Sequence, residues 1–158
     1  MRRAWWLVSP GNPLKREGPA PLDRRLARAA EVADDPRIAV TGIEAELGTR
    51  YTADTLAALR RLRPDLRLIW LMGADNLAQL HRWRDWRNIA AHHPMGVLAR
   101  PGLRVAARVS PAAQALERFR LREPGLLPRR GPPAWCLVNI PMRADSSTAI
   151  RARGGWRR

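Results

Sequence analysis

Short runs of branched and aromatic residues recur along the chain and predict its strands. Five of them begin at Ala4, Arg37, Leu66, Met95 and Ala134, and they read AWWLVS, RIAVTGIEA, LRLIWLMG, MGVLAR and AWCLVNIP. Most are continuously apolar rather than alternating, which is typical of strands covered on both faces. We therefore expect a sheet that lies between layers of helix.

Apolar residues at helical spacing fill the intervals between these runs. The spacing predicts three helices, through Leu22, Leu26, Ala29 and Ala30, through Leu56, Leu59 and Leu62, and through Ala112, Ala115, Leu116 and Phe119. Because strand and helix alternate, the pattern favours an α/β fold with a doubly wound parallel sheet. We expect a single domain over residues 1–158.

The ends of these elements carry local signals. Thr52 is expected to cap the second helix, with Asp54 in its first turn, and Pro64 is expected to stop it. Residues 124–133, PGLLPRRGPP, contain too much proline for a regular element, so we expect an exposed connection there.

The basic charge has two interpretations. The net charge is +15, and arginine supplies 28 of the 29 basic residues, since Lys15 is the one lysine. The arginines are spread over helix faces opposite the apolar stripe, as in LDRRLARAAEVA, which is typical of a solvated surface. We expect phosphate ligands and no specific nucleic acid; an arginine-rich domain that binds nucleic acid nonspecifically is the alternative.

The lack of a secretory or membrane-spanning segment in the sequence, together with a single cysteine, favours a cytoplasmic protein without a membrane partner. Ser9, Pro10 and Gly11 break the apolar opening before the roughly 7 to 15 residues of a secretory core. No segment approaches the roughly 18 apolar residues of a membrane span. Cys136 is the single cysteine and lies inside an apolar run, as expected of a buried, reduced thiol.

Ligands of parallel sheets bind at the carboxyl ends of the strands, where loops lead into helices. These loops read SPGNPLKR, GTRYTADT, GADNL, ARPG and PMRADSSTAIR. In the last loop, Ser147 and Thr148 stand at an expected helix start and Arg151 follows one turn later. This arrangement predicts an anion site or, alternatively, a capped helix without a ligand.

The GADNL loop and the tryptophans after it offer further candidates. Gly73 permits close backbone approach, and Asp75 can bind a ribose hydroxyl, help to hold a metal or cap the next helix. Trp83 and Trp86 have helical spacing, so both can lie on one face, one in the core and one stacked on a cationic ring. Lys15, near Asn12, suits phosphate as a point charge.

The histidines point to no metal site. His81, His92 and His93 have no acid or cysteine at ligand spacing, and the pair before Pro94 is expected at a helix end.

Together, the motifs SPGNPLK, YTADTL, GADNL, HRWRDW, ARPG and SSTAIR resemble those of the bacterial nicotinate mononucleotide adenylyltransferases, over about Trp5 to Arg153. SSTAIR alone is shared with other nucleotidyltransferases, so an enzyme of the phosphopantetheine or cytidylyl type is the alternative. The resemblance implies a Rossmann-like nucleotidyltransferase fold. It also implies adenylyl transfer from ATP to nicotinate mononucleotide, which gives deamido-NAD and pyrophosphate in NAD biosynthesis, with Mg2+ accompanying the ATP.

The same resemblance implies roles for individual residues. The expected ATP-binding residues are Gly73, Asp75, Ser147, Thr148 and Arg151. The expected substrate-binding residues are Asn12, Lys15, Tyr51, Thr52, Trp83 and Arg100. Among these, backbone groups of Tyr51 and Thr52 are expected on the nicotinate, and Trp83 is expected to stack on the pyridinium ring. Arg151 and Lys15 are the expected catalytic residues, because they would stabilise charge on the departing pyrophosphate.

The start of the chain departs from the family pattern. Family members begin with a strand, a glycine-rich loop and an HxGH motif, whereas this chain begins MRRAWWLV. We therefore expect the first strand of the sheet to be missing, with Met1 internal to a longer protein; an inactive remnant is the alternative. In either case the chain as written is expected to lack efficient catalysis.

Overall fold

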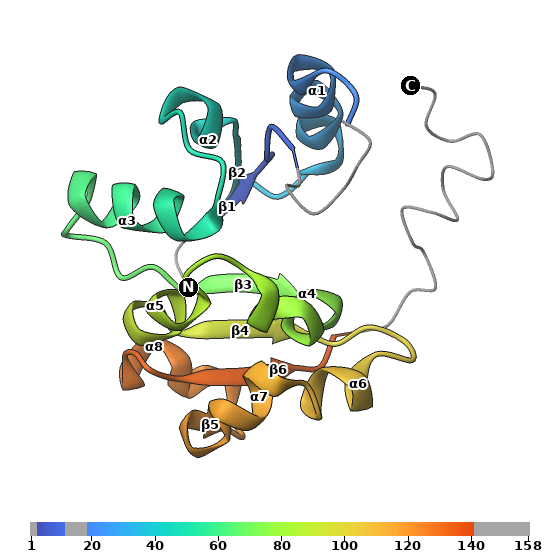
Figure 1. Ribbon diagram of the computed structural model, residues 1–158. Helices are drawn as coiled ribbons and strands as arrows, with labels where there is room; N and C mark the ends of the chain where they lie inside the picture. The colour runs from blue at the N-terminus through green and yellow to red at the C-terminus, as the bar shows by residue number, and fades with distance from the viewer. Residues whose placement is uncertain (1–2, 12–18, 141–158) are drawn as a thin grey trace. The chain divides into compact units, whose positions relative to one another are not determined.

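A computed structural model describes residues 3–11 and 19–140 of the chain (Figure 1). It divides into two units, with the boundary after Leu66, and each unit is described by itself below. The expectation of a single domain stays a prediction. Among the described residues, no helix combines the length and the apolar character that a membrane crossing requires.

The described residues of the first unit, 3–11 and 19–66, form two parallel strands and three helices. Its elements in chain order are β1 (Ala4–Leu7), α1 (Leu22–Val32), β2 (Ile38–Thr41), α2 (Ile43–Glu46) and α3 (Thr52–Leu62). Strand β1 pairs with β2 so that Ala4 lies opposite Ile38 and Leu7 opposite Thr41. The arginine side chain of Arg25, on α1, donates hydrogen bonds to the carbonyl oxygens of Ser9, Pro10 and Ala20 and so ties α1 to the residues after β1.

Two expectations for this unit are wrong in detail. The apolar run from Arg37 is a strand only to Thr41, because the chain turns at Gly42 into α2, which the sequence pattern did not predict. Thr52 is the first residue of α3 rather than its cap: Tyr51 occupies the cap position in an extended conformation, and no side chain caps the helix. The expected Asp54 in the first turn and the end of the helix before Pro64 are confirmed.

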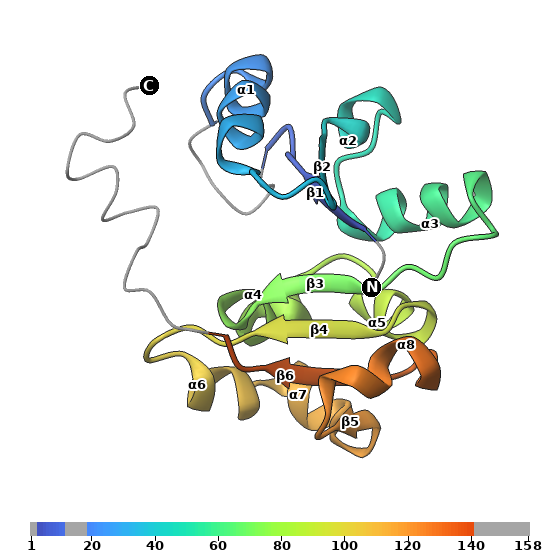
Figure 2. The ribbon, with the colours of Figure 1, turned by 180° about the vertical axis from the view of Figure 1, so that it is seen from behind.

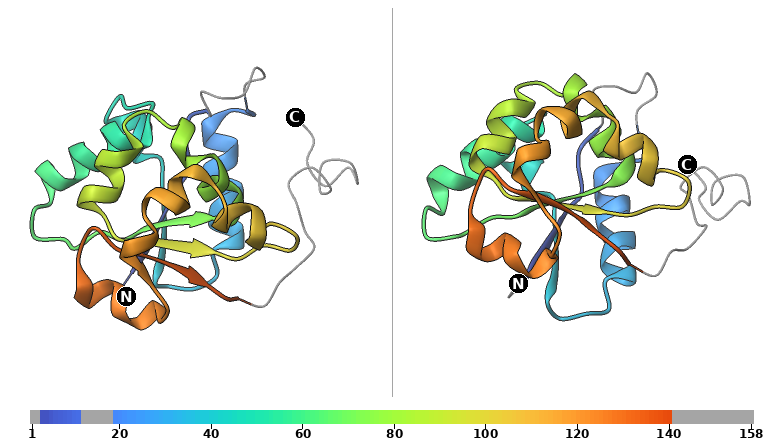
Figure 3. Two further views of the ribbon diagram at one scale, coloured as in Figure 1. Left: turned by 60° about the horizontal axis from the view of Figure 1, so that its bottom comes forward. Right: turned by 90° about the horizontal axis from the view of Figure 1, so that it is seen from below.

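The second unit is built on four parallel strands in the order β3-β4-β6-β5. These are β3 (Trp70–Gly73), β4 (Met95–Leu98), β5 (Arg120–Leu121) and β6 (Trp135–Val138). Figure 3 shows the three longer strands, drawn in green, yellow and orange, pointing the same way. The helices between them are α4 (Ala74–Gln79), η1 (Leu80–Arg82), α5 (Trp86–His92), α6 (Arg104–Arg108), α7 (Pro111–Ala115), η2 (Glu117–Phe119), η3 (Pro124–Leu126) and α8 (Leu127–Arg130).

Both faces of this sheet are covered, as the continuous apolar runs predict. On one face, Leu127 of α8 packs with Ala134 and Cys136, and Figure 2 shows α8 on the side turned away from the viewer in Figure 1. Neighbouring residues of a strand point to opposite faces, so Trp135 lies on the other side. There its indole nitrogen donates to the Leu116 carbonyl oxygen at 2.9 Å, which fastens the end of α7 to the sheet. The expected parallel α/β architecture is confirmed.

Two local expectations for the second unit are wrong, and one strand was not expected at all. The proline-rich stretch 124–133 contains η3 and the short helix α8, because Pro124 and Pro128 fall in first turns, where the missing N–H is not needed. The helix expected through Phe119 divides into α7 and η2 after Ala115. Strand β5 is only two residues long, too short for a periodic signal.

Candidate functional site

The carboxyl ends of the neighbouring strands β3, β4 and β6 meet at one edge of the sheet. The register places Gly73 opposite Leu98, and Leu98 opposite Val138, so the chain leaves all three strands at the same level. The loops after β3 and β4 therefore begin side by side, which is where parallel α/β sheets bind ligands.

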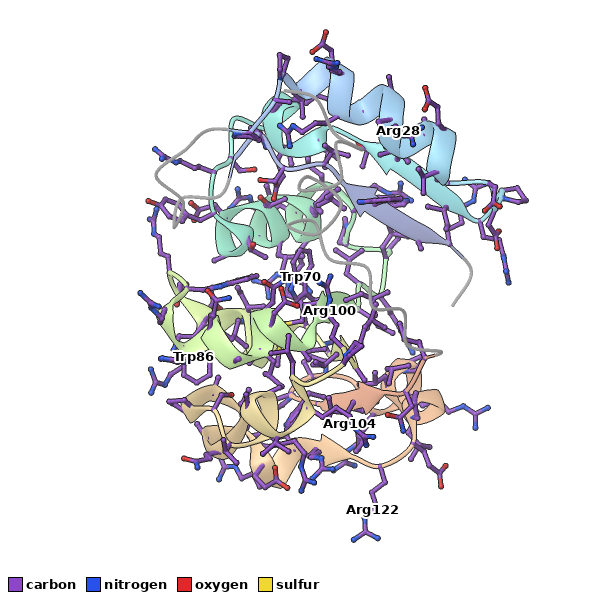
Figure 4. All side chains as sticks on the ribbon, turned by 90° about the vertical axis from the view of Figure 1, so that its right-hand side faces the viewer. Arg28, Trp70, Trp86, Arg100, Arg104 and Arg122 are labelled. Carbon is purple, nitrogen blue, oxygen red and sulfur yellow. The ribbon has the colours of Figure 1, made fainter. Side chains whose placement is uncertain are left out.

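An ion pair joins the first two of these loops. Asp75 lies in the first turn of α4, directly after β3, and Arg100 follows β4. The Arg100 Nε atom lies 3.4 Å from the Asp75 Oδ1 atom, and the two side chains are 53% and 38% exposed. Figure 4 labels Arg100 among the side chains of this unit. The contact is an ion pair without hydrogen-bond alignment, since Asp75 Oδ1 is buried and accepts no hydrogen bond from the described residues.

Gly73 leaves the space in which this pair lies. A Cβ atom built on Gly73 would collide with Asp75 Oδ1 and would stand 3.1 Å from Arg100 Nε. Its backbone angles, φ −75° and ψ 160°, are open to any residue, so the requirement for glycine is one of space. A partly exposed carboxylate and a guanidinium beside it can together take a hydroxyl and an anionic oxygen.

Trp83 and Trp86 do not share a helix face, contrary to the expectation from their spacing. Trp83 lies in the bend after η1 and is half-buried, whereas Trp86 begins α5 and is buried. Asp85 stands between them with a left-handed φ of 51°, which reverses the chain direction. The expectation that one of the two belongs to the core is confirmed for Trp86, whose ring also lies 4.5 Å from the Arg87 guanidinium.

In the first unit, a threonine near the start of α3 contacts a buried acidic residue. Glu44 is only 6% exposed, and its Oε1 atom lies 3.3 Å from the Thr55 hydroxyl, which in turn lies 2.8 Å from the Thr49 hydroxyl. Analysis of the sequence missed Glu44 because it lies in a four-residue helix without periodicity. The available signal was an acid placed directly after an apolar strand.

Comparison with known proteins decides the family. No protein-family model matches the chain. The chain is 62% identical over 156 residues to a probable nicotinate-nucleotide adenylyltransferase of Ruegeria pomeroyi, covering 98% of this chain and 73% of that protein. Proteins of the same description from Roseobacter denitrificans and Parvibaculum lavamentivorans are 58% and 54% identical, each over 98% of this chain and 78% of their own length. The chain belongs to the nicotinate-nucleotide adenylyltransferase family.

Solved structures agree with this on the level of the fold. Nicotinic acid mononucleotide adenylyltransferase of Plasmodium falciparum, complexed with NaAD, matches with a TM-score of 0.66 at 14% identity, over 96% of this chain and 69% of that chain. The same enzyme complexed with APC matches with a TM-score of 0.61, over 96% of this chain and 68% of that chain. The expected nucleotidyltransferase fold and an enzyme class that transfers adenylyl groups in NAD biosynthesis are thus confirmed.

The residues expected to act in a nicotinate-nucleotide adenylyltransferase fall into four groups. The structure brings Gly73, Asp75 and Arg100 together at the edge of the second unit. Trp83 lies apart from this pair in the chain, and Tyr51 and Thr52 stand at the start of α3 in the first unit. The remaining candidates, Asn12, Lys15, Ser147, Thr148 and Arg151, lie outside the described residues and stay predictions.

Proposed function

We propose that this chain binds ATP and nicotinate mononucleotide and serves the transfer of the adenylyl group between them. The observation that carries the proposal is the Asp75–Arg100 pair beside Gly73, at the edge of the sheet where α/β folds bind nucleotides. The Arg100 guanidinium suits an anionic oxygen of a phosphate, and the partly exposed Asp75 carboxylate suits a ribose hydroxyl.

The chemistry asks the protein to align two anions. A phosphate oxygen of nicotinate mononucleotide attacks the α-phosphorus of ATP; the bond from that phosphorus to the bridging oxygen breaks, and pyrophosphate leaves with the electron pair. Protein groups contribute by positioning both phosphates and by stabilising the charge on the departing pyrophosphate. Lys15 and Arg151 are proposed for that charge, and Asn12, Ser147 and Thr148 for phosphate contacts.

The start of α3 is proposed to take the nicotinate carboxylate. Tyr51, at the cap position, makes no side-chain hydrogen bond to this eleven-residue helix, so the N–H groups of Thr52 and Ala53 at its start suit an anion. Half-buried Trp83 is proposed to stack on the pyridinium ring, since an indole face attracts a cationic ring.

Mg2+ is proposed to arrive with ATP. The described residues hold no group of three histidine, cysteine, aspartate or glutamate side chains that could bind a metal by themselves. Mg2+ is commonly held by one or two carboxylates together with substrate phosphates, and Asp75 fits the part of such a carboxylate. When bound, the ion would neutralise phosphate charge.

A cytoplasmic location is proposed from the state of the cysteine. The buried Cys136 is the chain's single cysteine and carries no disulfide, as expected where thiols stay reduced.

Calorimetric titration tests the proposal. The unmodified chain should bind both ATP and nicotinate mononucleotide, and Arg100→Ala should weaken ATP binding by about tenfold or more, the loss of one charge-assisted contact. Arg122→Ala is the matched control, because Arg122 is exposed and points into solvent (Figure 4). Failure to bind either ligand would refute the proposal. Equal binding of CTP or phosphopantetheine would point to the alternative nucleotidyltransferase.

A further inference from the structure

The side chain of Arg25 joins the two ends of the loop between β1 and α1. This loop covers residues 8–21, of which 8–11 and 19–21 are described. The Arg25 Nε atom donates to the Ala20 carbonyl oxygen at 2.8 Å, next to the start of α1. Its Nη1 and Nη2 atoms donate to the carbonyl oxygens of Ser9 and Pro10 at 2.6 and 3.2 Å, just after β1. One guanidinium therefore holds both ends of the loop.

Two further contacts lie where the ends of the loop meet. A Cβ atom built on Gly11 would stand 3.8 Å from the Pro19 Cδ atom, an ordinary van der Waals distance. The Ser9 hydroxyl donates to the Gly11 carbonyl oxygen at 2.8 Å and so fixes the turn that leaves β1. The loop is thus closed at its base, and the three hydrogen bonds of Arg25 hold it closed.

Arg25 can serve as a fixed point because α1 is anchored to the rest of its unit. Leu26, the next residue, packs against Gly42 after β2, where a built Cβ atom would stand 3.2 Å from the Leu26 Cδ1 atom. Ala29, one turn further along α1, is buried. The planar fork of an arginine can donate to several carbonyl oxygens at once, whereas a lysine ammonium is a single point of charge.

The loop that Arg25 closes contains a residue of the proposed function. Lys15, proposed for the charge on the departing pyrophosphate, stands in sequence between the two ends that Arg25 joins. When the ends of a loop are already held together, less conformational entropy is lost as the loop binds a ligand. A residue in such a loop therefore contributes more of its contact to the affinity.

We propose that Arg25 is a positioning residue, which holds the two ends of this loop together and thereby enables Lys15 to bind the phosphates of ATP. The inference rests on the proposed function, because it takes Lys15 as a phosphate contact. An arginine that only supported the fold would change the stability of the first unit without changing what Lys15 contributes. An arginine that itself bound phosphate would act independently of Lys15.

A double-mutant cycle distinguishes these roles by calorimetric titration of the full chain with ATP. Lys15→Ala should raise the Kd of ATP about tenfold, the size of one lost charge-assisted contact. Arg25→Ala should raise it about three- to tenfold, since Lys15 can lose at most its whole contact. The double variant should bind ATP as Lys15→Ala does, because the loop then carries no lysine to place. AMP lacks the phosphates that leave as pyrophosphate, so its Kd should stay unchanged throughout.

Two variants control for charge. Arg28→Ala removes a positive charge from the exposed face of the same helix, where Arg28 pairs with Glu31, and should leave the Kd of ATP unchanged (Figure 4). Arg25→Lys keeps the charge but not the fork, so it should weaken ATP binding almost as much as Arg25→Ala. Full affinity in Arg25→Lys would show that charge alone matters and would overturn the inference.

The outcomes separate this inference from the proposed function. An unmodified chain that binds no ATP overturns both. Unchanged affinity in Lys15→Ala removes the role proposed for Lys15 and this inference with it, while ATP binding itself stands. If Lys15→Ala is weaker but Arg25→Ala is not, or if the two losses add in the double variant, the inference alone is overturned.

Stability is followed by a thermal melt of each variant. If Arg25→Ala fails to fold, Arg25→Lys takes its place in the cycle with the same expected pattern. Failure of both to fold would make Arg25 a residue of stability and would overturn the inference. Equal weakening of ATP and AMP would overturn it as well, since that is what a general loss of structure produces.

Discussion

Replacing Gly73 by alanine separates the binding role of the Asp75–Arg100 pair from the stability of the fold. The substitution leaves the backbone unstrained, because φ −75° and ψ 160° suit alanine. The new Cβ atom would overlap Asp75 Oδ1 and crowd Arg100 Nε at 3.1 Å. The Asp75 side chain can rotate, so we expect it to turn away from the new Cβ atom and its ion pair with Arg100 to break.

The substitution should change the stability of the fold much less than the affinity for ATP. The pair is 53% and 38% exposed, and an ion pair so open to solvent contributes about 0 to 1 kcal/mol to folding. Alanine in place of glycine offsets this by about 0.4 to 1 kcal/mol, because it restricts the unfolded chain. Binding loses a hydrogen bond between Asp75 and a ligand hydroxyl, about 1.5 to 3 kcal/mol, or roughly a 10- to 150-fold weaker affinity for ATP.

Calorimetry with ATP and a thermal melt on the same samples measure both quantities. Gly125→Ala is the control, since a Cβ atom at Gly125 meets nothing within 4 Å. Unchanged ATP affinity in Gly73→Ala would refute the part assigned to Asp75. A large fall in Tm would show that the backbone, rather than the Asp75 side chain, had absorbed the collision.

Three further predictions concern stability, pH and reactivity. Ser110→Ala should lower the free energy of unfolding in urea by about 1 to 3 kcal/mol, because the buried hydroxyl accepts from the Ala113 N–H at the start of α7 and donates to the Ala107 carbonyl oxygen. A urea midpoint that shifts no further than when an exposed residue of similar size is replaced would contradict this. Hydrogen bonds from Arg37 lower the pKa of Asp35 from 3.8 to about 2, so its contribution to stability is complete above pH 3.8 and is lost as the pH falls through about 2. An NMR titration of the Asp35 carboxyl should show that midpoint, and a value near 3.8 would exclude the interaction in solution. Burial raises the pKa of the Cys136 thiol despite the opposing charge of Arg120, so a thiol reagent at pH 8 should label the protein only after unfolding, and rapid native labelling would place Cys136 at the surface.

The sequence predicted the longer elements because each has its own local signal. Continuous apolar runs located β1, β2, β3, β4 and β6, and the covered faces of the second unit's sheet followed from the same pattern. Helices α1 and α3 each span eleven residues, enough for periodicity to appear. Short elements without an apolar run of their own, such as α2, β5 and α8, carry no period and depend on tertiary contacts, so they could not be found in this way.

The residues of the candidate site could likewise be predicted only in part. Gly73 and Asp75 were found because they stand at the end of an apolar strand, and Arg100 was expected from the family resemblance; the parallel register then joins them. The orientation of Trp83 was missed because it depends on one left-handed residue, Asp85, which no spacing rule reveals. Glu44 was missed because its importance comes from burial against Thr55, a residue eleven positions away in sequence.

The matched register of β3 and β4 also has a consequence for how the site can change over evolutionary time. Gly96 lies opposite Leu71, and a Cβ atom at Gly96 would stand 2.6 Å from the Leu71 side chain, so a larger residue there would displace that side chain. A slip of one residue would move Asp75 by about 3.3 Å relative to Arg100 and turn every side chain of the strand over. Selection for a ligand at this edge therefore also acts on the pairing of β3 with β4, along residues that lie away from the edge. The loops, by contrast, can be exchanged for others while the strands stay as they are.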